Sequence, residues 1–199
     1  MGIAERKIRQ KEEVRSSILD VAWKIVETEG WQALSIRKIA DAIEYSAPVI
    51  YDHFENKEAI LLEFTKRGFH LLTRQLEAAK KQFAGPDKQL EAMAYAYWHF
   101  AFKNQEYYQL MYGLGMPGCE MTQSIPELHA FSALIRATIQ ELIDMSRDKS
   151  ADATLKLHTF WSMLHGLISI NMMGKETREE MNLMVLKDFI VSFIAGIRG

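Results

Sequence analysis

The stretch that decides the fold runs from residue 35 to residue 54 and reads Ser35-Ile36-Arg37-Lys38-Ile39-Ala40-Asp41-Ala42-Ile43-Glu44-Tyr45-Ser46-Ala47-Pro48-Val49-Ile50-Tyr51-Asp52-His53-Phe54. Its first half repeats apolar residues at the spacing of one helix face. Ser35 and Ser46 each stand where a helix N-cap is preferred. The stretch therefore predicts two short helices joined by a tight turn, a helix-turn-helix.

A helix-turn-helix needs an inner face that holds its two helices together and an outer face on the second helix. We expect the inner face to consist of Ile39, Ala40, Ile43, Ile50 and Phe54. The outer face is then left to Ser46, Ala47, Val49, Tyr51 and His53. In DNA-binding versions of this motif the second helix enters the major groove.

The sequence on both sides of this stretch also has helical periodicity. One helix face, Val14 to Ile25, precedes a break at Gly30, and Asn56 is placed to cap a long helix that reaches about residue 83. After Gly85-Pro86, further helices are predicted at about 87–103, 105–112, 126–146, 151–173 and 177–198. Strand-like alternation is absent, so we expect an all-α fold of about nine helices.

The composition is that of a globular protein. The 199 residues are 48% hydrophobic with a net charge of −2, which excludes a uniformly basic nucleic-acid coat but leaves room for a local basic patch. The single cysteine, Cys119, excludes an internal disulfide framework. The most apolar stretch, residues 160–173, is too short to span a bilayer. We expect a cytoplasmic protein with no membrane segment.

Several motifs in the first third of the chain occur in the order and spacing of the TetR family of bacterial transcriptional regulators, which the sequence resembles. They are Ile18-Leu19-Asp20-Val21-Ala22, Glu29-Gly30, Ser35 to Ala40, Ser46 to Phe54, and Asn56-Lys57-Glu58-Ala59-Ile60-Leu61. The resemblance implies a basic N-terminal arm (1–11), a three-helix DNA-binding domain (12–72, with the helix-turn-helix at 35–54) and a helical domain for effector binding and dimerisation (73–199).

Carried over residue by residue, the resemblance implies a set of DNA-binding positions. Ser35 and Arg37 would touch the backbone or groove edge from the first short helix, and Lys57 would contact a phosphate at the start of the long helix. The positions on the recognition helix would be Ser46, Ala47, Pro48, Tyr51 and His53. Helix N-termini at Ser46 and Asn56 favour phosphate, and the arm, with a net charge of about +3, would add phosphate contacts.

Two residues depart from the family pattern. Glu44 occupies the turn position that glycine usually holds. A left-handed backbone there would cost a non-glycine residue about 1–2 kcal/mol, which favours a different turn. Asp52 places a carboxylate on the recognition helix, where it would repel phosphate unless it faces Arg37 or Lys57 or accepts from a cytosine amino group.

The second half of the chain resembles the family in architecture only, apart from Trp161, His165 and Gly166, which are similar to a Trp…His-Gly signature of one subclass of C-terminal domains. The helix at 151–173 is apolar almost all round and the last helix is broadly apolar, so both need cover on several sides. The resemblance implies that these last two helices pair with their copies in a homodimer. The alternative is that they are simply core.

The middle helices are rich in methionine and aromatic residues, which suit an adaptable apolar pocket. The resemblance implies a small hydrophobic or aromatic effector there, and the candidate ligand-binding residues are Trp98, Tyr108, Met111, Phe131, Trp161 and His165. The alternative for each of them, and the more common role of such a residue taken singly, is core packing, and for His165 it is pairing with a backbone carbonyl.

Enzyme motifs do not fit this sequence. The segment Gly113 to Gly118 matches G-x-G-x-x-G literally but follows a helix and contains Pro117, and the six histidines are scattered. No catalytic residue, metal site or cofactor is therefore expected. The leading hypothesis is a dimeric, ligand-responsive DNA-binding regulator that acts as a repressor, and the sequence leaves open an activator or a regulator without a small-molecule effector. The alternative is a helical ligand-binding or protein-interaction module without specific DNA binding.

Overall fold

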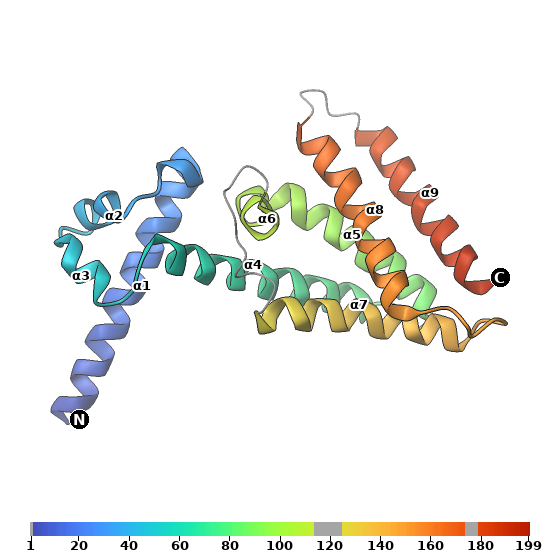
Figure 1. Ribbon diagram of the computed structural model, residues 1–199, viewed down its shortest axis with the longest axis horizontal. Helices are drawn as coiled ribbons and strands as arrows, with labels where there is room; N and C mark the ends of the chain where they lie inside the picture. Colours follow the sequence, from blue (N-terminus) through green and yellow to red (C-terminus); the bar gives the residue numbers. More distant parts are fainter. Residues whose placement is uncertain (1, 114–124, 174–178) are drawn as a thin grey trace. The chain divides into compact units, whose positions relative to one another are not determined.

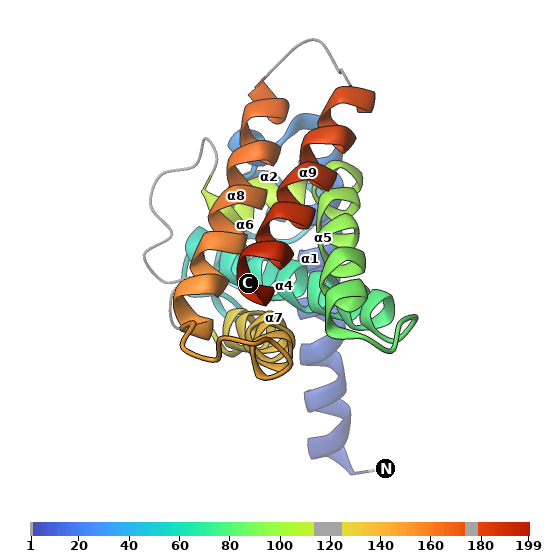
Figure 2. The same ribbon diagram turned by 90° about the vertical axis from the view of Figure 1, so that its right-hand side faces the viewer.

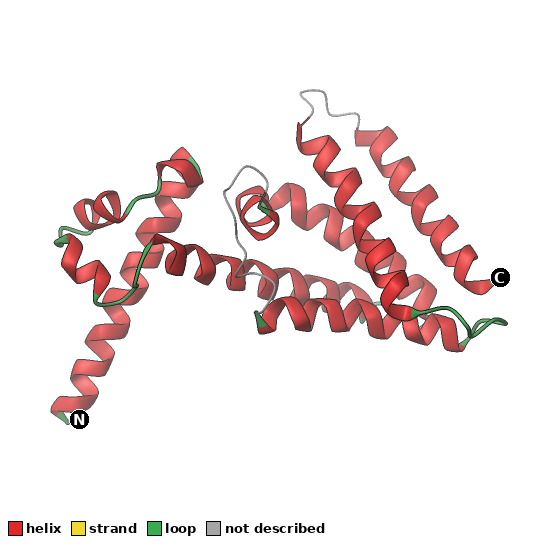
Figure 3. Ribbon diagram, in the orientation of Figure 1, coloured by secondary structure: helices red, strands yellow, loops and turns green. Residues whose placement is uncertain are grey.

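The computed structural model of the chain describes residues 2–113, 125–173 and 179–199, and Cys119 lies outside these ranges. Within them the chain forms nine α-helices and one short 3-10 helix, and Figure 3 shows helices joined by loops with no strand. The predicted all-α fold is confirmed. None of the described helices is long and apolar enough to cross a membrane.

The chain divides into two compact units. The first comprises residues 1–65 and 106–122, and the second comprises residues 66–105 and 123–199. The first unit holds α1 (Ile3–Glu29), the 3-10 helix (Trp31–Ala33), α2 (Ile36–Ala42), α3 (Ala47–Tyr51), the start of α4 (Lys57–Lys80) and nearly all of α6 (Gln105–Tyr112). The second holds the rest of α4, α5 (Pro86–Lys103), α7 (Pro126–Asp144), α8 (Ala153–Met173) and α9 (Glu179–Arg198).

An aromatic cluster ties α6 to α1 and α4 within the first unit. The rings of Trp23 and Tyr107 stack with centroids 4.2 Å apart, and Phe64 lies 5.5 Å from Trp23 and 5.6 Å from Trp31. Trp31 Nε1 donates a hydrogen bond of 2.8 Å to the carbonyl oxygen of Glu106. The core of this unit therefore includes a helix that is distant in sequence from the helix-turn-helix.

The segment interpreted as an N-terminal arm is helical, because α1 begins at Ile3 rather than near residue 12. Residues 4–11 contain neither glycine nor proline and consist mostly of good helix formers. The backbone N–H of Gly2 donates to the Glu5 carboxylate at 2.9 Å, which satisfies one group at the helix start. Residues 4–13 are all exposed, so this part of α1 has helical form without a packed face.

The turn of the helix-turn-helix keeps the left-handed conformation despite its glutamate. Glu44 has a φ of +59°, so the expectation of a different turn is wrong. The backbone N–H of Tyr45 donates to Ala40 O at 3.0 Å and that of Glu44 donates to Asp41 O at 3.3 Å. This pair of bonds is the Schellman arrangement, which satisfies the last carbonyls of α2 and holds the turn against the strain at Glu44.

Replacing Glu44 by glycine is expected to stabilise the protein. Glycine adopts a positive φ without the steric penalty, and part of that gain is offset by its greater freedom when unfolded. We expect Glu44→Gly to raise the free energy of unfolding by about 0.5–1 kcal/mol. Urea titrations at equal protein concentration measure this, with Glu44→Ala as the control that removes the charge and keeps the β-carbon. A gain in Glu44→Ala equal to that in Glu44→Gly would contradict the backbone explanation.

The second unit is a helical bundle with its own aromatic core. Phe131 of α7 is fully buried, and its ring lies 6.0 Å from Phe69 and 5.9 Å from Tyr97. Figure 2 shows α8 and α9 side by side, and a triangle of Phe160, Phe189 and Phe193 with ring separations of 5.2–5.8 Å fills the space between them. These contacts bury one side of each of the last two helices.

Candidate nucleic-acid interface and ligand site

The recognition helix α3 is held by its buried inner face. Ile39, Ala40, Ile50 and Phe54 are all buried, and Ile43 packs against the same cluster, as the sequence predicts. Ser35 accepts a hydrogen bond from the Lys38 backbone N–H at 3.2 Å and so caps α2. The inner face therefore sets which side chains of α3 point outward.

The helix α3 is shorter than the sequence analysis expects. It ends at Tyr51, so Asp52 and His53 lie in the turn that follows and not on the helix itself. The His53 backbone N–H donates to Ile50 O at 3.0 Å, a three-residue step that tightens the last turn. Ser46 has the extended backbone of an N-cap, but its side chain makes no capping hydrogen bond, which leaves the hydroxyl available at the helix start.

The predicted DNA-binding residues lie at the surface of the first unit. Ser35, Arg37, Ser46 and Pro48 are exposed, and Tyr51 has 55% of its surface accessible. Ala47, His53 and Lys57 are half-buried. Arg37 lies 3.9 Å from Asp41 one turn along α2, and both side chains remain largely open to solvent. An exposed pair of this kind is weak, so Arg37 can exchange Asp41 for a phosphate.

The start of α4 is a second capped helix N-terminus beside α3. Asn56 Oδ1 accepts from the Ala59 backbone N–H at 2.8 Å, as predicted for a cap at this position. Lys57 follows as the first residue of α4. A positive side chain together with unpaired N–H groups and the positive end of the helix dipole forms a suitable site for one phosphate.

Arg15 is a residue of this region that the sequence analysis missed. Its Nη2 donates to Glu63 Oε2 at 2.8 Å, and its guanidinium carbon lies 4.3 Å from the centre of the Phe54 ring. Arg15 thus joins α1 and α4 to the turn that follows α3. The sequence signal that could have identified Arg15 is its position directly after Val14, at the edge of the apolar face of α1.

His53 is kept neutral by its surroundings. Burial lowers the pKa of His53, and the positive charges of Lys11 and Arg15 act in the same direction, while the carboxylate of Asp52 opposes them. The Nδ1 atom of His53 is buried and has no hydrogen-bond partner among the described residues. This ring therefore lies beside the positive side chains of α1 as well as at the end of α3.

Part of the predicted ligand-binding set comes together in the second unit. The ring of Phe131 lies 6.0 Å from that of Trp161, and Trp161 Nε1 lies 3.2 Å from the hydroxyl of Tyr97, to which it donates. Tyr97 was not singled out from the sequence, although it adjoins Trp98. Trp98 packs instead on Phe102, with ring centres 4.5 Å apart. Tyr108 and Met111 are buried, and both belong to the first unit.

A polar stripe crosses the otherwise apolar helix α8. Trp161, His165 and Ser169 follow one another at intervals of four residues, so they share one face. Burial lowers the pKa of His165, which favours a neutral imidazole. Ser169 Oγ is buried with no hydrogen-bond partner in the described part of the chain. Buried polar groups are normally paired, so this stripe fits a ligand with a polar group.

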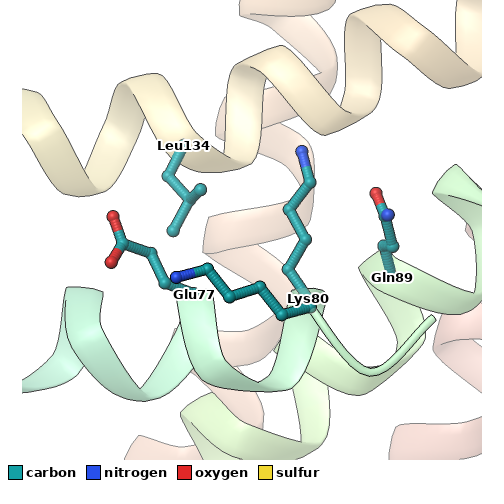
Figure 4. Close-up of a pocket in the computed structure, with 5 residues that line it drawn as sticks. Glu77, Lys80, Gln89 and Leu134 are labelled. Atoms are coloured by element: carbon teal, nitrogen blue, oxygen red, sulfur yellow. The ribbon is translucent and has the colours of Figure 1, made fainter. Parts of the chain in front are cut away.

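A surface pocket of about 350 Å³ also lies in the second unit. Figure 4 shows Glu77 and Lys80 from α4, Gln89 from α5 and Leu134 from α7 around it, and Lys81 completes the lining. Lys80 Nζ is 3.2 Å from Glu141 Oε1. Three of its five lining side chains, those of Glu77, Lys80 and Lys81, are charged, so this pocket suits a polar ligand better than the apolar effector expected from the sequence. The described residues contain no group of three or more metal-ligating side chains.

Comparison with known protein families gives two matches to this chain, one over the helix-turn-helix and one over the C-terminal half. A family model described as "Bacterial regulatory proteins, tetR family" matches residues 18–64, which contain the helix-turn-helix. A second, described as "Tetracyclin repressor-like, C-terminal domain", matches residues 90–181. The chain belongs to the TetR family. It is a transcription regulator with a DNA-binding domain and a C-terminal domain of the ligand-binding type, and not an enzyme.

Two relatives that align with most of this chain are also described as HTH-type transcriptional regulators. The HTH-type transcriptional regulator YobS of Bacillus subtilis (strain 168) is 26% identical over 180 residues, which are 90% of each chain. The HTH-type transcriptional regulator Rv0681 of Mycobacterium tuberculosis (strain ATCC 25618 / H37Rv) is 24% identical over 92% of this chain and 81% of Rv0681.

Solved structures show the same fold. A Rhodococcus sp. RHA1 protein of unknown function superposes with a TM-score of 0.79 at 24% identity, covering 93% of this chain and 95% of its own. FadR of Bacillus subtilis, solved in complex with stearoyl-CoA, superposes with a TM-score of 0.70 at 18% identity. The superposition covers 92% of this chain and 97% of the FadR chain. TetR-family regulators bind DNA and small-molecule effectors and dimerise.

Proposed function

We propose that this TetR-family regulator is a repressor that binds a palindromic operator as a homodimer and is released by a small hydrophobic or aromatic effector. Residues 12–72 read the DNA, and residues 73–199 bind the effector and dimerise. The observation that supports the DNA-binding part of this proposal is the group of solvent-accessible side chains on α2, on α3 and at the start of α4. Tyr51 and Lys57 are the two residues of this group that we most expect to contact DNA.

The dimer is proposed to form through α8 and α9. Each helix leaves large apolar side chains exposed after the packing within one subunit is complete, among them Leu155, Met163 and Ile170 on α8 and Met181, Met184, Val185 and Val191 on α9. Pairing with the same helices of a second copy, as a four-helix interface, would cover both faces. A two-fold dimer also matches the symmetry of a palindromic site.

The effector is proposed to combine an apolar body with one hydrogen-bonding group. The aromatic rings of Phe131 and Trp161 supply apolar contacts, and the stripe that ends at Ser169 supplies polar ones. FadR of Bacillus subtilis in complex with stearoyl-CoA is a precedent for a long apolar ligand in this fold. A saturable rise in melting temperature with such compounds, reduced in Phe131→Ala, would support the site. The absence of a shift across apolar and aromatic compounds would count against it.

The experiment that tests the DNA-binding proposal is selection of bound duplexes from a randomised pool at two salt concentrations. An inverted repeat bound more tightly than random DNA at both salts is the expected result. Only weak, salt-sensitive binding with no shared sequence would favour the alternative, a helical ligand-binding or protein-interaction module that has lost specific DNA recognition.

Loss of the Lys57 side chain is expected to remove one phosphate contact. Lys57→Ala should lower the slope of log affinity against log salt by about 0.9 and weaken operator and random DNA alike. Tyr51→Ala should weaken operator binding more than random binding, since Tyr51 lies on the recognition helix. Lys149→Ala, which removes an equal charge from an exposed position in the second unit, is the matched control. Unchanged affinity in both Lys57→Ala and Tyr51→Ala would exclude this surface.

A further inference from the structure

The helix-turn-helix and the start of α4 carry the wrong net charge for binding DNA by themselves. Residues 35–58 contain three basic and five acidic side chains, a net charge of −2. Affinity for DNA depends strongly on cations that neutralise phosphates. Asp52 lies at the C-terminal end of α3, and the exposed Glu44 lies in the turn that precedes α3. Additional positive charge must therefore come from another part of the first unit.

The exposed N-terminal part of α1 carries that charge. We call residues 3–11 the α1 extension, which ends before Glu12 and Glu13. Its nine residues hold four basic side chains and one acidic one, a net charge of +3: Arg6, Lys7, Arg9 and Lys11 against Glu5. Every residue from 4 to 13 is exposed, so the extension contributes no packed face to the core. Figure 1 shows it continuing past α2 and α3 toward the N-terminus.

The positive side chains are divided between two faces of the α1 extension. Lys7 and Lys11 are four residues apart and Arg15 follows after four more, so they form one stripe along the helix. Arg15 is fixed against Phe54 and Glu63, which directs the stripe toward the end of α3. Lys11 lies one turn before Arg15 on the same face of α1, the face that meets the turn after α3, and its positive charge contributes to lowering the pKa of His53. Arg9 lies on the other side of α1, 3.5 Å from Glu13.

The helical form of the α1 extension limits where it can lie on DNA. An α-helix with its side chains is about 10–12 Å across, whereas the minor groove is about 6 Å wide. A flexible arm could enter that groove, but this helix cannot. From Lys7 to Arg15 the stripe advances about 12 Å along the helix, which is long enough to follow successive phosphates on one strand.

We propose that the α1 extension is a rigid helical clamp that lies along the DNA phosphate backbone beside each operator half-site, with Lys7 and Lys11 as its two contacts. This inference rests on the proposed function, because it requires that the first unit bind duplex DNA. The clamp supplies the positive charge that the recognition surface lacks. It acts on affinity and not on sequence choice, since phosphates carry no direct base information.

The test compares two double variants of equal charge in the full-length protein, with the selected operator and a random duplex as probes. Lys7→Gln/Lys11→Gln removes the stripe, and Arg6→Gln/Arg9→Gln removes two charges from the rest of the helix. We expect the first to lower the salt slope by about 1.8, with an unchanged ratio of operator to random affinity. The second should lower it by less than half as much. Equal slopes in the two variants would overturn the assignment of the stripe, and a changed ratio would overturn a backbone-only role.

A separate variant tests whether the clamp must be helical. Gln10→Pro keeps every charge but breaks the helix before Lys11, because proline removes a backbone hydrogen bond and clashes with the preceding turn. We expect its salt slope to fall by about 0.9, as in Lys7→Gln alone. A wild-type slope in Gln10→Pro would show that a flexible arm is sufficient and would overturn the helical clamp. Melting temperatures should match the wild type in all these variants, since the substituted positions are exposed.

Failure of the clamp and failure of the proposed function give different results. If the wild-type protein selects no shared duplex sequence, the proposed function is wrong. If it selects an inverted repeat while Lys7→Gln/Lys11→Gln binds with the wild-type slope, the function holds and the clamp is wrong.

Discussion

Replacing Ile170 by glutamate is expected to convert the regulator into a monomer and to lower its operator affinity by about 10²–10⁴-fold. Ile170 has 66% of its surface exposed on α8, and Met163, two turns earlier on the same face, has 51%. A carboxylate at this position would have to be buried in an apolar four-helix interface, where an unpaired charge is strongly unfavourable. Binding would then rely on one half-site instead of two.

The measurements for this prediction are sedimentation to obtain the oligomeric state and titration of the operator to obtain the affinity. Met145→Glu is the matched control, because Met145 is a large exposed apolar residue just after α7 and outside α8 and α9. It should leave both quantities unchanged. If Ile170→Glu sediments as a dimer and binds the operator normally, the interface lies elsewhere.

The helix-turn-helix could be predicted from the sequence because its signals are local. The apolar spacing of Ile36 to Ile43 and the caps at Ser35 and Asn56 are set by neighbouring residues, and both caps make the expected backbone contacts. The same local reasoning was wrong at Glu44. The penalty for a left-handed residue is real, but the Schellman bonds and the packing of Ile39 and Ile50 outweigh it.

The contacts that were missed join residues far apart in the sequence. Arg15 reaches Phe54 and Glu63, and Trp31 reaches the backbone of Glu106, 75 residues away. Periodicity identifies which face of a helix is buried but not which partner covers it. The aromatic candidates show the same limit, because Phe131 and Trp161 meet in the second unit while Tyr108 and Met111 belong to the first. The predicted boundary between domains at residue 72 and the assigned DNA contacts stay predictions.

Truncation of Phe64 is expected to have the largest effect on stability. Its side chain is fully buried, and its ring contacts those of Trp23 and Trp31 at 5.5 and 5.6 Å. Removing a buried phenylalanine side chain costs about 3–5 kcal/mol, from lost burial together with the cavity left behind. Single domains are stable by only about 5–15 kcal/mol, so Phe64→Ala should leave the DNA-binding unit marginal.

Tryptophan fluorescence can assign this loss to the first unit. Trp98 and Trp161 belong to the second unit, so a Trp98→Phe/Trp161→Phe background leaves only Trp23 and Trp31 as reporters beside Phe64. Urea titrations in that background should show the midpoint falling sharply for Phe64→Ala. Phe83→Ala, at a position with 44% exposure, should change the free energy of unfolding by less than about 0.5 kcal/mol. A loss below about 1 kcal/mol in Phe64→Ala would mean that the aromatic cluster is not what holds α1, α4 and α6 together.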